Sequence, residues 1–214
     1  MSTLLSPGRH ADGTSVAAGR MTSAAAAVGW LTALVLVYLV AVWTPLGQVV
    51  DTSLMRGALA LRGEWSDEVL DAVSPATLLV AGGLAVVLGG GSWGTRGALR
   101  AGVTVVATVV ASQVLKAVLP RPTWFDDALN SLPSGHVAAV AGLAVATAYA
   151  APPAVRAPLG VLGAVTTALV GLATLAEQWH RPSDVIASVL LAAAVGAAVH
   201  LAPATSRTRP ETTR

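Results

Sequence analysis

The sequence contains no cysteine, only one phenylalanine and few charged residues, which make up 11% of its 214 positions. The absence of cysteine excludes disulfides, thiolate metal sites and cysteine nucleophiles. A soluble globular domain carries about a quarter charged residues, so this chain has too little polar surface to cover itself in water. Hydrophobic residues make up 54% and the mean hydropathy is +0.69. This composition indicates an integral membrane protein.

The basic sequence pI of about 9.7 raises the question of a nucleic-acid partner. The basic residues are scattered among apolar segments, however, and do not gather on one face with interleaved aromatic residues. We therefore expect no nucleic-acid binding, and the bilayer is the expected environment.

Six apolar stretches are long enough to cross a hydrocarbon core, which requires about 20 helical residues. They cover residues 23–43, 75–92, 98–118, 135–152, 157–177 and 184–202. The first is longer than the apolar core of a cleavable signal peptide, so we expect it to be retained. The prediction is an all-α, polytopic membrane protein with a six-helix transmembrane bundle over 23–202. Polar tails at 1–22 and 203–214 are predicted to be disordered.

The distribution of charge predicts the orientation of the bundle, because basic residues accumulate on the cytoplasmic side of short-loop membrane proteins. With six crossings, one face holds both tails and the loops at residues 96–100 and 156. That face carries eight basic and two acidic residues, a net charge of +6, whereas the other carries five basic and nine acidic residues, a net charge of −4. We expect both termini in the cytoplasm of a bacterial cell, with the opposite face outside the plasma membrane.

Small residues inside the predicted spans favour close packing of helix backbones, because lipid offers no hydrophobic drive for helix association. The glycines concerned are Gly82, Gly83, Gly142, Gly163 and Gly171. The loop after the first span carries Val50, Leu54, Ala58 and Leu61 at helical spacing. This pattern indicates either a short helix lying in the membrane interface or a solvated loop.

The segment Pro133-Ser134-Gly135-His136 stands directly before the apolar part of the fourth span. The start of a helix offers unpaired N–H groups and a positive dipole end, and glycine lets the backbone approach an anion closely. The segment therefore suits phosphate oxygens. Taken alone, it fits equally well an N-cap serine followed by a surface histidine.

His180 and Asp184 lie one helical turn apart at the start of the sixth span. A carboxylate in this position can keep one imidazole nitrogen protonated and leave the other free to attack an electrophile. The alternative is that Asp184 only caps the helix, where its charge suits the helix dipole.

Two basic residues, Lys116 and Arg121, flank the end of the third span. Each can anchor at lipid headgroups or hold phosphate oxygens. Pro120 and Pro122 hold Arg121 in a rigid loop next to the Ser-Gly-His segment, which favours a functional role for this arginine. His10 and His200 have no identifiable partner in the sequence.

A metal site is the competing use of two histidines and several acids. No segment has the spacing of a zinc site, and the adjacent acids Asp126 and Asp127 are more typical of a solvated turn than of a magnesium site. We predict no metal and no cofactor.

Together these motifs resemble the type 2 phosphatidic acid phosphatase (PAP2) superfamily. Its signature is Lys-x6-Arg-Pro, then Pro-Ser-Gly-His, then Ser-Arg-x5-His-x3-Asp. The second motif matches fully at 133–136, and His180 and Asp184 match the third. The Ser-Arg pair of the third motif is replaced by Ala173 and Thr174.

The first motif also diverges from the pattern of this superfamily. Lys116 matches, but Arg121-Pro122 stands two positions early, and Thr123-Trp124 occupies the expected place. One guanidinium of the usual phosphate clamp is therefore missing, and a second is displaced. Either Arg181, next to His180, supplies compensating charge, or the protein binds phosphate weakly and has lost or changed its activity.

The resemblance implies a metal-independent lipid phosphatase acting on a polyprenyl (pyro)phosphate, a phosphatidic acid or a similar membrane lipid. His180 would attack phosphorus and form phosphohistidine, Asp184 would orient it, and His136 would protonate the leaving oxygen. The resemblance also implies that Lys116, Arg121, Ser134 and Gly135 would hold the phosphoryl oxygens. Arg181 is our additional candidate for this role. A non-catalytic phospholipid-binding or scaffold protein on the same fold is the alternative.

Overall fold

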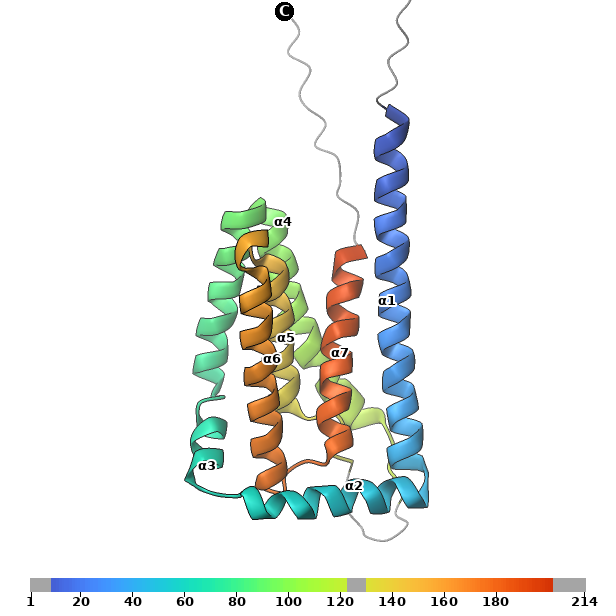
Figure 1. The fold of residues 1–214 in the computed structure, drawn as a ribbon, viewed down its shortest axis with the longest axis vertical. Helices are drawn as coiled ribbons and strands as arrows, with labels where there is room; N and C mark the ends of the chain where they lie inside the picture. Colours follow the sequence, from blue (N-terminus) through green and yellow to red (C-terminus); the bar gives the residue numbers. More distant parts are fainter. Residues whose placement is uncertain (1–8, 123–129, 202–214) are drawn as a thin grey trace, which may run out of the picture.

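The computed structural model describes residues 9–122 and 130–201, with side chains from residue 21 onward, and all regular elements in these ranges are helical. This confirms the predicted all-α class. Figure 1 shows the helices, whose bounds are α1 (Arg9–Trp43), α2 (Pro45–Ala58), the short 3-10 helix η1 (Leu59–Leu61), α3 (Glu64–Asp71), α4 (Pro75–Val118), α5 (Gly135–Ala150), α6 (Pro153–Ala176) and α7 (Pro182–Leu201).

The first helix begins earlier than the apolar pattern predicted. α1 starts at Arg9, so the expectation of a disordered segment over residues 1–22 is wrong for residues 9–22. This stretch continues, toward the N-terminus, the apolar helix that follows, where a run of four alanines at 24–27 has high helix propensity. Residues 1–8 and the predicted tail 203–214 lie outside the described residues.

The helix α4 is a hairpin of two arms, 75–93 and 95–118, that meet at Gly94. This residue has φ +67°, a conformation that glycine adopts without steric cost. Beyond it the chain doubles back, and a Cβ atom added to Gly89 would lie only 2.6 Å from the carbonyl oxygen of Gly97. Figure 1 shows the two arms meeting at this bend and running away from it toward the opposite end of the bundle. They correspond to the second and third predicted spans.

By length and apolar composition, four helices in the described part of the chain can cross a membrane: Met21–Trp43, α4, α6 and α7. α5 is equally apolar but has only 16 residues. Counting the arms of α4 separately and adding α5 gives the six apolar segments that the sequence predicted. Large hydrophobic side chains on the outer faces are exposed, for example Leu79, Val87 and Val161, as expected for helices surrounded by lipid.

Close helix packing is confirmed at three of the five glycines that the sequence singled out. Added Cβ atoms at these positions would press into neighbouring side chains, and the pairs are Gly142 with Thr108, Gly163 with Ala144, and Gly171 with Val185. The prediction is wrong for Gly82 and Gly83, which have open space around them because they lie on the outer face of the first arm of α4.

α2 lies across one end of the bundle (Figure 1), which confirms a helix and rules out the solvated loop. It begins at Pro45 because the Thr44 hydroxyl accepts a hydrogen bond from the N–H of Gly47 at 2.9 Å. Gln48 and Asp51 are its buried residues and face the bundle. Its position in a membrane interface stays a prediction.

The bundle has two distinct ends, here called the α2 end and the Gly94 end. The starts of α5 and α7 and the end of α6 lie at the α2 end (Figure 1). The start of α1, the connection between α5 and α6, and the end of α7 lie at the Gly94 end. Both ends of the described chain therefore lie on the same side of the bundle, as an even number of crossings requires.

Candidate active site

The two histidine motifs come together at the α2 end, where α5 and α7 begin side by side. The backbone N–H of Ser134 donates to the carbonyl oxygen of Asp184 at 3.2 Å. The Ser188 hydroxyl lies 2.9 Å from the carbonyl oxygen of Ser134 and 2.7 Å from that of Asp184. These buried bonds fix the start of one helix to the start of the other.

His180 and Asp184 form a buried pair, with 3.2 Å between Nδ1 and Oδ2. His180 is 8% exposed and Asp184 is fully buried. The same Oδ2 accepts hydrogen bonds from the Arg181 N–H at 2.9 Å and from the Ser131 hydroxyl at 2.6 Å. Since a carboxylate only accepts, Nδ1 carries a proton, and in the neutral ring Nε2 of His180 is then the nitrogen with the lone pair.

The turn between α6 and α7 places His180 at the site. α6 ends at Ala176, and Gln178 adopts a positive φ of 59°. The N–H groups of Trp179 and His180 then donate to the carbonyl oxygen of Thr174 at 3.0 and 3.3 Å. Thr174 itself is fully buried, and its hydroxyl donates to Gly171 within the helix. The position that lacks the family's arginine thus supports the turn through its backbone.

Ser134 is the N-cap of α5, and its Oγ accepts from the N–H of Val137 at 3.4 Å. The N-cap interpretation is therefore confirmed, whereas the binding of phosphate here stays a prediction. Gly135 leaves little room, because an added Cβ would lie 3.0 Å from Nε2 of Gln113. The sequence analysis missed Gln113, although a glutamine inside an apolar span three positions before Lys116 was a signal.

His136 faces the same region as the buried pair. Its ring is tilted against that of Trp179, with 5.7 Å between centroids. It also interacts electrostatically with both His180 and Lys116. The structure therefore brings these three predicted residues together from α4, α5 and the turn before α7.

The loop that carries Arg121 is held on both sides. The Tyr38 hydroxyl donates to the carbonyl oxygen of Pro120, and the Gln48 side chain donates to that of Pro122 at 2.8 Å. Arg121 is half-buried between them and interacts electrostatically with Asp51. The expected rigid loop is thus present, and residues of α1 and α2 stabilise it in addition to the prolines.

Arg181 is 6% exposed and lies beside the Asp184 carboxylate. Its Nη1 donates to the Ser131 hydroxyl at 3.2 Å, and that hydroxyl in turn donates to Asp184. A bridge of two hydrogen bonds therefore connects the guanidinium to the carboxylate. Its expected role on a phosphate stays a prediction.

Two buried acids near the site were not predicted. The Asp51 carboxylate accepts from the N–H and the hydroxyl of Ser183 at 2.9 and 2.6 Å, so α2 caps the start of α7. Burial raises the pKa of Asp51, and the hydrogen bonds from Ser183 oppose this rise. Glu177 accepts from the Ser66 hydroxyl at 2.6 Å and pairs with Arg62 at 2.8 Å. Asp51 therefore connects α2 to the start of α7, and Glu177 connects the turn that carries His180 to α3.

The remaining sequence candidates lie elsewhere. His200, for which the sequence identified no partner, lies in the last turn of α7 and stacks on Tyr149 at the Gly94 end, with 3.8 Å between centroids. Asp126, Asp127 and the Thr123-Trp124 pair lie outside the described residues, as does the side chain of His10. Within residues 9–122 and 130–201, no group of three or more histidines and acids has the arrangement of a metal site.

Comparison with known proteins agrees with the motifs. The family model of the PAP2 superfamily matches residues 97–208, more than half of the chain. The fold is similar to the crystal structure of a transmembrane PAP2-type phosphatidylglycerolphosphate phosphatase from Bacillus subtilis, with a TM-score of 0.65 and 20% sequence identity. That match covers 82% of this chain and 94% of the other. No curated protein matches the sequence.

Proposed function

Because this chain belongs to the PAP2 superfamily, we propose that it is a metal-independent lipid phosphatase that works through a phosphohistidine intermediate. The hydrogen bond between His180 and the buried Asp184, next to the start of α5, is the observation that carries this proposal. A histidine oriented in this way presents Nε2 as a nucleophile. The adjacent Ser134 and Gly135 supply the backbone of a helix start for phosphate oxygens.

The proposed reaction has two steps. The lone pair on Nε2 of His180 attacks phosphorus, the bond from phosphorus to the lipid oxygen breaks, and that oxygen takes a proton from His136. Water then attacks the phosphohistidine, His136 recovers a proton from this water, and the bond between nitrogen and phosphorus breaks to release inorganic phosphate. The charge on Asp184 stabilises the positive imidazole ring in between.

Binding of the phosphoryl oxygens is assigned to positive charge and to backbone N–H groups. Phosphoryl transfer depends mainly on positioning and on electrostatic stabilisation of the three equatorial oxygens. Lys116 and Arg121 supply charge from either side of the end of α4, and Arg181 adds a guanidinium next to the nucleophile. This arrangement provides the compensation needed for the missing arginine at Thr174.

The proposed substrate is a phosphomonoester or pyrophosphate of a membrane lipid, of the polyprenyl or phosphatidic acid type. Its phosphate reaches the α2 end on the extracytoplasmic face of a bacterial plasma membrane. The charge difference between the two faces of the chain supports this side, and the Bacillus subtilis neighbour supports the bacterial membrane. The substrate of that neighbour, phosphatidylglycerolphosphate, is a further phosphomonoester for testing.

Release of inorganic phosphate by the purified protein, measured with a chelator present, tests this function. Phosphatidic acid, phosphatidylglycerolphosphate and a polyprenyl pyrophosphate form the substrate panel. We expect turnover of at least one lipid by the wild type and by His10→Ala, and none by His180→Ala. Absence of turnover by the wild type on all three lipids would favour the non-catalytic binding or scaffold alternative.

The proposed side of the active site can be tested separately, because the chain has no native cysteine. Arg56 on α2 and Thr95 beside the Gly94 bend are both exposed and lie at opposite ends of the bundle. In intact cells, an impermeant thiol reagent should label Arg56→Cys and leave Thr95→Cys unlabelled. The reverse pattern would contradict an extracytoplasmic site without affecting the proposed chemistry.

A further inference from the structure

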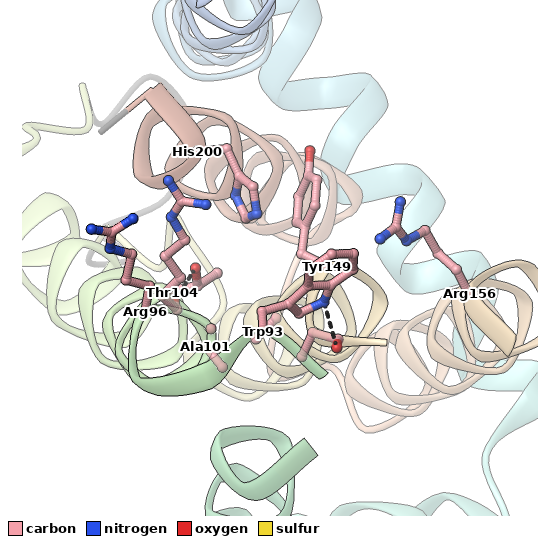
Figure 2. Close-up of a pocket in the computed structure, with 11 residues that line it drawn as sticks. Trp93, Arg96, Ala101, Thr104, Tyr149, Arg156 and His200 are labelled. Carbon is pink, nitrogen blue, oxygen red and sulfur yellow. Dashed lines mark hydrogen bonds between the residues drawn. The ribbon is translucent and has the colours of Figure 1, made fainter. Parts of the chain in front are cut away.

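A pocket with charged and aromatic lining residues lies at the Gly94 end, away from the histidine pair. It has a volume of about 400 Å³ (Figure 2), and its main lining side chains are Trp93, Arg96, Arg100, Tyr149, Arg156 and His200. They come from the bend of α4, the end of α5, the start of α6 and the end of α7. α5 alone separates the two sites by about 24 Å, at 1.5 Å per residue.

Several of these side chains are fixed by contacts within the pocket. Nε1 of Trp93 donates to the carbonyl oxygen of Ala150 at 3.0 Å, as Figure 2 shows. His200 stacks on Tyr149 with an angle of 26° between the rings, and its Nδ1 lies 2.9 Å from the carbonyl oxygen of Gly196. A carbonyl oxygen only accepts, so Nδ1 carries the hydrogen and Nε2 of His200 is available to a ligand.

The pocket gathers positive charge. Three arginines line it, and none of its lining residues that the structure describes is acidic. Arg100 and Arg156 both interact electrostatically with His200, so both guanidinium groups lie near the same ring of the cavity. The three arginines carry the same charge, and an anion bound in the pocket would offset their mutual repulsion.

We propose that this pocket binds a phosphate group. Arginine presents a planar fork of donors that matches phosphate oxygens, and its charge is permanent. The volume lies within the range of small-molecule sites, roughly 300–1,000 Å³. Basic pockets between membrane helices are also a recurrent feature of sites for anionic lipid headgroups. A lipid headgroup and free inorganic phosphate share this chemistry.

A different explanation is that these arginines only follow the general excess of positive charge on one side of a membrane protein. That rule requires basic residues in the loops, but not their convergence on one cavity. It also does not explain the histidine stacked on Tyr149 or the Trp93 side chain held at the rim. The two explanations make different predictions for chemical modification. Only a phosphate site predicts that a phosphate group protects these arginines from modification more than it protects other arginines.

Chemical modification of arginine by phenylglyoxal, followed residue by residue with peptide mass spectrometry, tests the proposal. In the first arm, the modification rate of each arginine in the full-length protein is measured in detergent, with either phosphate or chloride at equal ionic strength. In the second arm, the same rates are measured in nanodiscs of either phosphatidylglycerol or zwitterionic phosphatidylcholine. Arg56, exposed on α2 at the other end, is the internal control. The readout does not depend on enzymatic turnover, so failure of the proposed function leaves it unaffected.

We expect modification of Arg100 and Arg156 to slow several-fold with a phosphate group present, while Arg56 keeps its rate. Protection by inorganic phosphate in detergent identifies free phosphate as a ligand, and protection only in phosphatidylglycerol identifies a lipid headgroup. Absence of protection in both arms, or equal protection of Arg56, would overturn the proposal.

A variant pair tests whether the arginines act on one ligand. Arg100→Gln should abolish the protection of Arg156, whereas the matched control Arg56→Gln should retain it. Undiminished protection of Arg156 in Arg100→Gln would contradict a shared site. The wild-type measurement needs no variant, so the proposal can be tested even if Arg100→Gln does not fold.

Discussion

Oδ2 of Asp184 lies 3.2 Å from Nδ1 of His180 and accepts two further hydrogen bonds, from the Arg181 N–H and the Ser131 hydroxyl. A carboxylate with three donors on one oxygen cannot rotate freely. It therefore fixes both the tautomer and the direction of the imidazole ring. The pair formed by His180, in the turn before α7, and Asp184, in α7, is thus organised before any substrate arrives.

Replacement of Asp184 by asparagine should lower kcat much more than it changes KM. The amide oxygen can still accept hydrogen bonds, but the negative charge that stabilises the positive ring of His180 is lost. We expect kcat to fall by about 10²–10⁴-fold, the range typical of a lost acid–base partner. Steady-state kinetics on a lipid phosphate measures this, with the exposed Asp67→Asn as the matched control. An increase in KM alone would instead indicate that Asp184 contacts the substrate.

Replacement of His136 by alanine should give a loss that depends on the leaving group. A general acid matters most when the leaving group is a poor one. The rate of phosphate release from a lipid phosphate, whose leaving group is an alcohol, should therefore fall by about 10²–10⁴-fold. An aryl phosphate with a good leaving group should lose considerably less. Rates of phosphate release from the two substrates by wild type and His136→Ala provide the comparison. Equal losses on both substrates would argue against His136 as the acid.

Much of the fold follows from local sequence patterns. Long apolar runs predicted the helical segments, and the span predicted at 184–202 agrees with α7 to within two residues at either end. The contacts that hold the site together could not be predicted in this way. Asp51 meets Ser183 across 132 positions, and Ser66 meets Glu177 across 111. No short-range pattern records such pairs, since they depend on how α2 and α3 cross the bundle.

Thr174 stands where the family pattern has an arginine, so another residue must supply positive charge to the phosphate. Arg181 and Arg121 are the two candidates, and their contributions can be compared directly. Arg181→Ala should lower kcat strongly, because its guanidinium also positions Ser131 beside Asp184. Arg181→Lys should recover part of the loss, since it restores charge without the planar fork. Kinetics of both variants and of Arg121→Ala on one lipid phosphate test this. If Arg181→Ala kept nearly wild-type activity while Arg121→Ala was inactive, the result would contradict compensation by Arg181.

The buried Asp51 predicts a pH dependence of stability. Because burial raises its pKa in the folded state, the folded protein holds this proton more tightly than the unfolded chain. The corresponding stabilisation is complete below the usual carboxyl pKa of 3.8 and is lost as the pH rises through the folded value. Asp51→Asn does not titrate, so the unfolding temperature of the wild type should fall relative to this variant over that window. A relative rise of the wild type would contradict the direction of the shift.

Two Gly→Ala substitutions should have opposite effects on stability, because Gly163 of α6 packs against α5 whereas Gly82 of α4 faces open space. At Gly163, an added Cβ would lie 2.6 Å from Cβ and 3.2 Å from Cα of Ala144, and neither atom belongs to a flexible side chain. The helices must move apart, so we expect destabilisation by about 1–3 kcal/mol, as for an overpacked core. At Gly82 the space is open, and alanine should gain about 0.5–1 kcal/mol through its higher helix propensity. Thermal unfolding of both variants in one detergent measures the difference, and equal shifts in Tm would show that helix propensity alone governs both positions.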